Sequence, residues 1–130
     1  MPLFVNGAGS KLTIRVPHRT RAETSMRYDV YVNPIEELRD LFPCVVEIQS
    51  DRLYAFSERV CLPLARPDVF PGMTDRLNPA VSVVGHETSL RLHPLGIAVF
   101  HQRELRTRLD NLGRDAFTID SAVDFLLRGY

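Results

Sequence analysis

The chain has 130 residues, of which 45% are hydrophobic and 25% are charged, and its formal net charge is zero. These are ordinary values for a globular domain with one core, and they exclude a disordered, collagen-like or coiled-coil protein. The charge is uneven, because residues 1–25 hold four basic residues and a single acid, while the remainder is mildly acidic. A mildly acidic body gives no field for holding phosphates, which argues against a free-standing DNA- or RNA-binding protein.

The two cysteines, Cys44 and Cys61, both fall within apolar stretches. A reduced thiol in such a stretch behaves as a small hydrophobic group, so core packing is favoured over a disulfide or a reactive thiol. No apolar run approaches the ~20 residues of a membrane span, and the N-terminus has no hydrophobic segment of a secretory signal. We therefore expect a cytoplasmic protein that does not engage a membrane.

Residues 1–25 form a basic extension with one alternating piece at residues 12–16. Either a docked extra strand or a loose arm is expected there. A targeting peptide is an alternative, although glycine and proline residues interrupt any amphipathic helix. The simplest interpretation is a dispensable extension before a second possible start at Met26, with the main domain at residues 26–130.

The stretch around which the domain is organised runs from Cys44 to Leu64 and reads CVVEIQSDRLYAFSERVCLPL. Apolar residues alternate on both sides of a polar break at Ser57 and Glu58, which predicts a β-hairpin with one buried face. A hairpin alone buries too little surface to be stable, so it needs further strands or a helix against its apolar side.

Further alternating runs of the same kind predict short strands at residues 27–32, 80–84, 88–92 and 95–100. A polar connection with about one helical turn follows the first of them, and a proline-containing loop at residues 66–73 follows the hairpin. Six short strands separated by turn residues favour a mainly β domain built as a small barrel or sandwich.

Two later segments show helical spacing. Residues 102–114 are charged, with leucines at helical intervals, and predict a short helix or an ordered loop. In the last segment Thr118 is a good N-cap and Asp120 lies in the first turn, where the helix dipole favours an acid. Its apolar residues share one face that is expected to pack on the sheet: Ile119, Ala122, Val123 and Leu126. Burying that face stabilises the fold by several kcal/mol, at roughly 25 cal/mol per Å².

Several motifs match a known family in order and spacing. MRYDVYVNP at Met26, VVEIQSDRLY at Val45, RVCLPLA at Arg59, LNPAVSVVG at Leu77 and a terminal helix ending in RGY resemble the CcdB toxins of toxin–antitoxin modules. The resemblance covers residues 26–130. It implies a small, partly open SH3-like barrel of antiparallel strands, related to that of MazF proteins, with a C-terminal helix.

The resemblance also implies a function without catalysis, metal or cofactor. CcdB-like toxins are homodimers that insert into the DNA gyrase A subunit and trap the enzyme covalently joined to cleaved DNA. A CcdA-like antitoxin neutralises them by wrapping a disordered segment over the toxin, and the pair represses its own operon, so DNA is a partner only of the toxin–antitoxin complex. A twofold dimer can use one contact patch twice on a twofold target.

In the family the gyrase contact is built from the loop after the QS element and from the last helical turn with the final residues. Carried over to this chain, the expected gyrase-binding residues are Ser50, Asp51, Arg52, Leu53, Asp124, Leu127, Arg128, Gly129 and Tyr130. Four of them depart from the plasmid toxin: Arg52 and Tyr130 replace aliphatic residues, Asp124 replaces an asparagine and Arg128 replaces a tryptophan central to poisoning.

The substitution at Arg128 bears on the strength of the toxin. The family tryptophan stacks on a gyrase arginine, so an arginine in its place loses the aromatic face and brings like charge towards the target. Three outcomes stay open: Tyr130 supplies the ring, the protein is a weak poison, or its target differs.

The sequence also contains residues that would suit other functions. HRT at His18 and HET at His86 are spaced as in two-histidine phosphoesterases, and His86, His93 and His101 are a conceivable metal set, although solvated loop histidines explain them more simply. A MazF-like RNA endonuclease is a further alternative, because those enzymes use a related barrel. It needs a basic groove with a reactive hydroxyl, and the mildly acidic body argues against it. A non-toxic CcdB-like scaffold that only binds an antitoxin is the remaining alternative.

Overall fold

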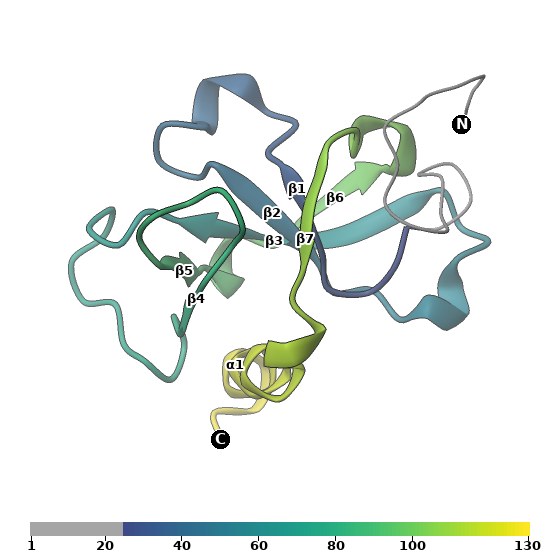
Figure 1. The fold of residues 1–130 in the computed structure, drawn as a ribbon. Helices are drawn as coiled ribbons and strands as arrows, with labels where there is room; N and C mark the ends of the chain where they lie inside the picture. Colours follow the sequence, from purple (N-terminus) through teal and green to yellow (C-terminus); the bar gives the residue numbers. More distant parts are fainter. Residues whose placement is uncertain (1–24) are drawn as a thin grey trace.

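The computed structural model describes residues 25–130, and the strand expected at residues 12–16 lies outside that range. The strands are β1 (Asp29–Val32), β2 (Cys44–Glu47), β3 (Glu58–Ala65), β4 (Ala80–Val81), β5 (Leu90–Leu92), β6 (Ala98–His101) and β7 (Arg108–Asn111). Short 3₁₀ helices are η1 (Glu36–Leu38), η2 (Asp51–Leu53), η3 (Pro94–Gly96), η4 (Gln102–Glu104) and η5 (Gly113–Asp115). A single α-helix, α1 (Ala116–Arg128), ends the described part of the chain (Figure 1).

All strand pairs are antiparallel, in the order β4-β5-β3-β2-β1-β7, and β6 also pairs with β3. Strand β3 is the longest strand and divides its outer edge between two partners. Its first residues pair with β6, from Glu58 opposite His101 to Cys61 opposite Ala98, and its last residues pair with β5. The sheet curls at this division into a half-barrel, with α1 at one end (Figure 1). The expected mainly β, partly open barrel with a C-terminal helix is confirmed.

The central hairpin is present as β2 and β3, with Val46 opposite Leu62. The expectation of one buried face was wrong, because both faces of β2 are covered. Val46 and Leu62 belong to the main core cluster beneath α1, whereas Val45 belongs to a second cluster closed by Phe100 and Leu105. The chain after β6 folds back over the second face, which alternation in β2 cannot reveal.

Both cysteines are buried and free, which confirms that they pack in the core. Cys44 lies in the main cluster and Cys61 in the second. Burial raises the pKa of the Cys44 thiol to about 11 and raises that of Cys61 as well. Thiols held in their protonated form in this way are inert towards oxidation and metal binding.

The helix or loop expected at residues 102–114 is instead η4 followed by the strand β7. Strand β7 pairs with β1, with Asn111 opposite Asp29, and a register shift interrupts the pairing. The leucines that suggested a helix serve different cores, because Leu105 lies in the second cluster and Leu112 in the main one. Long-range pairing with β1 therefore overrides the local helical spacing.

Helix α1 begins earlier than its sequence suggests. Its first residue is Ala116, and Asp115 occupies the N-cap position without a side-chain capping bond, so the expected cap at Thr118 and first-turn position of Asp120 were wrong. The chain enters α1 directly from η5, whose turn replaces a side-chain cap. The expected apolar face is confirmed for Ile119 and Ala122, which are fully buried in the main cluster, and for Val123, which packs against it, whereas Leu126 is only half-buried.

Candidate functional site

The loop after β2 presents apolar side chains to solvent from a fixed turn. Ser50 caps η2: its hydroxyl accepts a hydrogen bond from the Arg52 backbone N–H at 3.2 Å, and its carbonyl accepts one from the Leu53 N–H at 3.0 Å. Leu53 is exposed, and the next two large side chains, Tyr54 and Phe56, are 72% and 59% exposed. Isolated exposed hydrophobic residues are ordinary, but three within four positions form a patch that favours protein contact.

A buried arginine holds this loop from below. Arg59 is only 3% exposed and donates hydrogen bonds to the carbonyls of Tyr54, at 3.0 Å, and Phe56, and to the Gln102 side-chain oxygen at 2.9 Å. Because these donors are committed to the backbone of the loop, the loop keeps one shape while its apolar side chains point outward.

Glu47 lies next to Arg59 in the same buried region. Its carboxylate accepts a hydrogen bond from the Ser25 hydroxyl, and the Arg59 Nε is 3.7 Å from its Oε2. Burial dominates nonetheless and raises the pKa of Glu47 to about 7, against the smaller opposing effects of Ser25 and Arg59. Glu47 therefore changes charge near neutral pH, beneath the loop rather than in a cleft.

The C-terminal segment forms the second part of the expected surface. Helix α1 is closed by Gly129, whose φ of +80° is accessible to glycine and whose N–H donates to the Phe125 carbonyl at 2.9 Å. The remaining expected residues of this segment are all exposed: Asp124, Leu127, Arg128 and Tyr130. Leu127 and Tyr130 are 72% and 73% exposed, so these apolar side chains contribute little to the core.

Two residues just before β1, Arg27 and Tyr28, join the loop to the helix. The Arg27 backbone N–H donates to Asp51 in η2 at 2.7 Å, and its guanidinium donates to Asp120 in α1 at 3.2 Å. The hydroxyl of Tyr28 donates to the same Asp120 carboxylate at 2.9 Å. The two segments expected from the sequence to form one contact surface are therefore fixed relative to each other.

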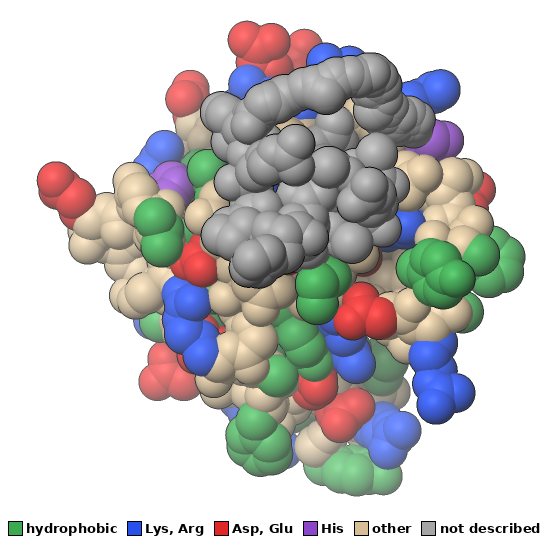
Figure 2. All heavy atoms as spheres, turned by 45° about the vertical axis from the view of Figure 1, so that its right-hand side comes forward, with side chains coloured by type: hydrophobic (Ala, Val, Ile, Leu, Met, Phe, Trp, Pro, Cys, Tyr) green, Lys and Arg blue, Asp and Glu red, His purple; other side chains and the backbone are tan. Residues whose placement is uncertain are grey.

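Figure 2 shows the molecule turned so that the right-hand side of Figure 1, where the loop with η2 lies, comes forward. Hydrophobic side chains are exposed at the right and at the lower edge of this face, with charged side chains between them (Figure 2). A mixture of apolar side chains and charges of both signs lacks the uniformly basic character of a nucleic-acid groove.

Arg27 and Tyr28 were not among the residues expected to form the site. The bonds of Arg27 span 24 positions to Asp51 and 93 to Asp120, and the bond of Tyr28 to Asp120 spans 92, so no local pattern marks either residue. Tyr54 and Phe56 were missed too, although two aromatic residues in a polar break between strands are a signal that could have found them.

The other constellations considered from the sequence do not come together. His86 lies 3.5 Å from the Cys44 sulfur, His93 stacks on phenylalanine rings, and His101 caps η4, so the three histidines have separate roles. Within residues 25–130 no group of three or more His, Cys, Asp or Glu side chains is arranged to hold a metal ion. The motif at His18 lies outside the described residues.

The half-barrel with its C-terminal helix, the rigid loop and the exposed helix end describe a small, mainly β protein that presents apolar side chains to solvent in two places. The family model described as CcdB protein matches residues 27–129, and the chain belongs to the CcdB family, the gyrase-poisoning toxins of toxin–antitoxin modules. This confirms the resemblance of the sequence motifs. A search of curated proteins finds no match. Among the described residues, no helix has the length and apolar character needed to span a membrane.

Proposed function

We propose that this protein is a homodimeric toxin that binds the A subunit of DNA gyrase and traps the enzyme on cleaved DNA, and that a CcdA-like antitoxin neutralises it. The observation that carries the proposal is the bridge from Arg27 and Tyr28 to Asp51 and Asp120, which fixes η2 against α1. A surface assembled before binding loses less conformational entropy on contact. The protein needs no catalytic group for this action.

The aromatic character of the surface supports retained binding despite Arg128. Tyr54, Phe56 and Tyr130 each expose most of their ring, and exposed tyrosines and phenylalanines are typical anchors of protein interfaces. Arg128 is exposed in the last turn of α1, where it also complements the helix dipole. We therefore propose that these exposed rings compensate in part for the tryptophan that the family has at this position.

An apolar strip supports the homodimer. Leu95, Ile97 and Val99 are all exposed, and Val99 lies opposite Val60 of β3 in the sheet. Ile97 and Val99 alternate with Ala98 and Phe100, which pack in the second cluster, so the strip faces away from that cluster. Two copies that meet along this strip would bury the same surface on each protomer, as twofold symmetry requires.

The decisive experiment measures DNA supercoiling and cleavage by purified gyrase in the presence of the full chain. Inhibition accompanied by linear cleaved DNA supports the proposal. Arg128→Trp should raise potency by about tenfold, since an aromatic contact of ~1.5 kcal/mol replaces a like charge. Glu37→Trp adds a ring on η1, at the opposite end of the molecule in Figure 1, and should leave potency unchanged.

The same preparation separates the alternatives. Cleavage of RNA without any effect on gyrase would establish a MazF-like endonuclease instead. Antitoxin binding without gyrase inhibition and without RNA cleavage would establish a scaffold that has lost toxicity. Induced expression in hosts with normal and CcdB-resistant gyrase gives the corresponding result in cells, because a gyrase poison arrests growth only in the first host.

A further inference from the structure

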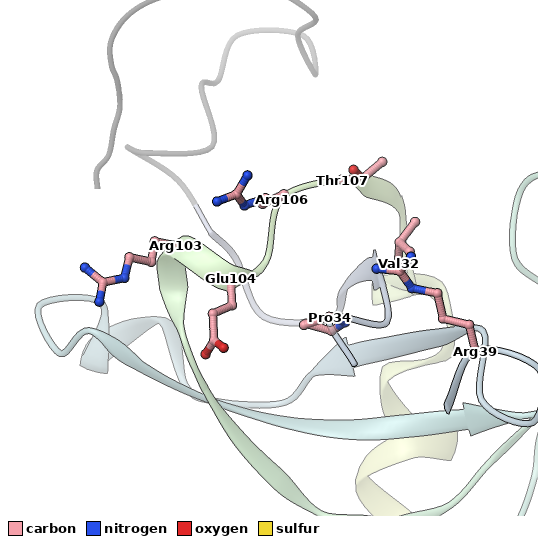
Figure 3. Close-up of a pocket in the computed structure, with 7 residues that line it drawn as sticks. All are labelled: Val32, Pro34, Arg39, Arg103, Glu104, Arg106 and Thr107. Carbon is pink, nitrogen blue, oxygen red and sulfur yellow. The ribbon is translucent and has the colours of Figure 1, made fainter. Parts of the chain in front are cut away.

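A cavity lined by three arginines is drawn in Figure 3, and the elements that bound it lie at the end of the molecule opposite α1 (Figure 1). It measures about 410 Å³ and is bounded by β1 with the loop that follows on one side and by the connection from η4 to β7 on the other. Three of its lining residues are arginines and one is a glutamate, while Val32 and Pro34 supply apolar surface. None of these residues belongs to the expected gyrase-binding surface.

Arg39 is held in place on one wall. Its Nε donates to the Asn33 carbonyl at 2.7 Å, and the buried Asn33 side chain accepts from the Ile35 N–H and donates to the Phe42 carbonyl, both at 2.9 Å. Asn33 thereby organises the whole turn that carries Arg39. Within residues 25–130 the terminal nitrogens of Arg39 form no ion pair, so they remain available to an anion.

The opposite wall is built by η4. The His101 Nδ1 accepts from the Arg103 N–H at 3.2 Å, and the Glu104 carboxylate accepts from the His101 N–H at 2.8 Å, which closes a capping box. The Thr107 carbonyl accepts from the Val32 N–H at 3.0 Å and ties this wall to β1. The backbone of both walls is therefore fixed before anything binds.

Arg103 and Arg106 complete the positive charge of the cavity. Both are exposed, and neither forms an ion pair with another described residue. In Figure 3, Arg106 lies above the cavity, Arg103 extends outward from its rim and Arg39 stands on the far side. The guanidinium groups are thus spread along an open cavity instead of converging on one point.

We propose that this cavity binds an extended acidic segment of a partner protein. Among the lining residues three guanidinium groups stand against one carboxylate. Guanidinium groups pair with carboxylates through two parallel hydrogen bonds. Their spread fits several carboxylates along an extended chain better than it fits one phosphate. The chain's own N-terminal extension does not match, because residues 1–25 hold four basic residues and one acid. The proposal goes beyond gyrase binding and is independent of it.

The test is fluorescence anisotropy of a labelled peptide of alternating glutamate and alanine, titrated with the full chain. The glutamate peptide should bind at least about tenfold more tightly than the matching glutamine peptide, and high salt should weaken its binding. Equal affinity for the two peptides would overturn the proposal. So would tighter binding of a single-stranded oligonucleotide of the same length, which would make the cavity a nucleic-acid site.

Matched variants locate the binding. Arg103→Gln with Arg106→Gln should weaken the glutamate peptide about tenfold, whereas Arg52→Gln with Arg128→Gln removes the same charge at the other surface and should have no effect. Glu104→Gln keeps the acceptor of the capping box, removes the opposing charge and should tighten binding about threefold, a gain that misfolding cannot produce. Equal losses from both arginine pairs, or no gain from Glu104→Gln, would contradict the assignment.

Discussion

Glu47 is a buried carboxyl group whose neighbours do not fully compensate for its loss of water. It is 3% exposed, and the nearest cation, Arg59, directs most of its donors to the carbonyls of the loop above. A charge in this position costs free energy, so the protonated form is favoured and the pKa rises to about 7. Because Arg59 holds the loop after β2, it neutralises Glu47 only in part, and this buried carboxyl group is easily protonated.

The raised pKa of Glu47 predicts that stability falls as pH rises from about 4.5 to about 7. The folded state holds the proton up to about 7, whereas the unfolded carboxyl releases it near its ordinary 4.5. The resulting stabilisation is fully present below 4.5 and is lost as pH rises to about 7, amounting to at most about 3 kcal/mol. Urea unfolding at fixed protein concentration should show this decline. Glu47→Gln should flatten it and should be more stable than the natural chain at pH above 7; an unchanged slope would contradict the assignment.

Tyr28 is the one non-glycine residue of the described chain with a positive φ, at +73°. A left-handed tyrosine costs about 1–2 kcal/mol. Three hydrogen bonds offset this cost: its N–H to the Glu47 carbonyl, its carbonyl from the Leu112 N–H, and its hydroxyl to Asp120. The strained backbone directs the ring towards α1, which places the strain at the bridge between the two parts of the contact surface.

Tyr28→Phe should loosen that bridge. Removing the hydroxyl deletes its bonds to Asp120 and should lower the free energy of unfolding by about 1 kcal/mol. Gyrase inhibition should weaken with it, because η2 and α1 are then joined through Arg27 alone. Tyr54→Phe is the matched control, since the exposed Tyr54 hydroxyl has no such role in the fold and its loss should leave chemical denaturation unchanged. Equal free energies of unfolding for the two variants would refute the positioning role of Tyr28.

At the scale of elements, alternation identified the hairpin and helical spacing identified the buried face of α1, because both depend on neighbours in sequence. Strand β7 could not be found in this way. It is four half-buried residues, RLDN, whose partners lie on β1 about eighty positions earlier, and two leucines beside it serve opposite faces. The predicted start of α1 was wrong for a similar reason. The chain enters the helix directly from η5, so no capping side chain marks its first residue in the sequence.

The end of α1 should be separable from the fold. Deleting 127–130 removes exposed side chains and the Gly129 cap but none of the buried face, so the free energy of unfolding should fall by no more than about 1 kcal/mol. Gyrase inhibition should be abolished, because Leu127 and Tyr130 belong to the proposed contact. Thermal melting and supercoiling assays measure the two effects. A large drop in melting temperature would show instead that the segment supports the core.

At the scale of the whole molecule, one sheet separates two cores. Strands β2 and β3 contribute alternate residues to each, so the sheet is buried on both sides and α1 covers only one of them. Binary patterning in β2 indicates strand but not how many faces are covered, since an antiparallel strand buried on both sides resembles any apolar run. The sequence could place the proposed contact surface only because its motifs match a family. The hydrogen bonds of Arg27 and Tyr28 that fix this surface could not be predicted, because they form only in the complete fold.

The beginning of the described chain is tied to the inner polar network. The Ser25 hydroxyl donates to Glu47, the Tyr31 hydroxyl lies 3.4 Å from Ser25, and the Met26 N–H donates to Asp29 at 2.9 Å. A chain that starts at Met26 keeps the bond to Asp29 through its amino group but leaves Glu47 without its hydroxyl donor. The domain boundary expected after residue 25 therefore cuts through a buried contact.

Truncation before and after Ser25 should give different stabilities. A chain lacking residues 1–24 should fold, dimerise and melt like the full chain, because its core is built from later residues. A chain lacking residues 1–25 should also fold but lose about 1 kcal/mol, the ordinary worth of one buried hydrogen bond. Ser25→Ala in the full chain should reproduce that loss, and Glu47→Gln should reduce it, since the uncharged amide depends less on the donor. Measurements at equal protein concentration keep dimerisation constant. Precipitation of the first truncated chain would show that the extension is part of the fold.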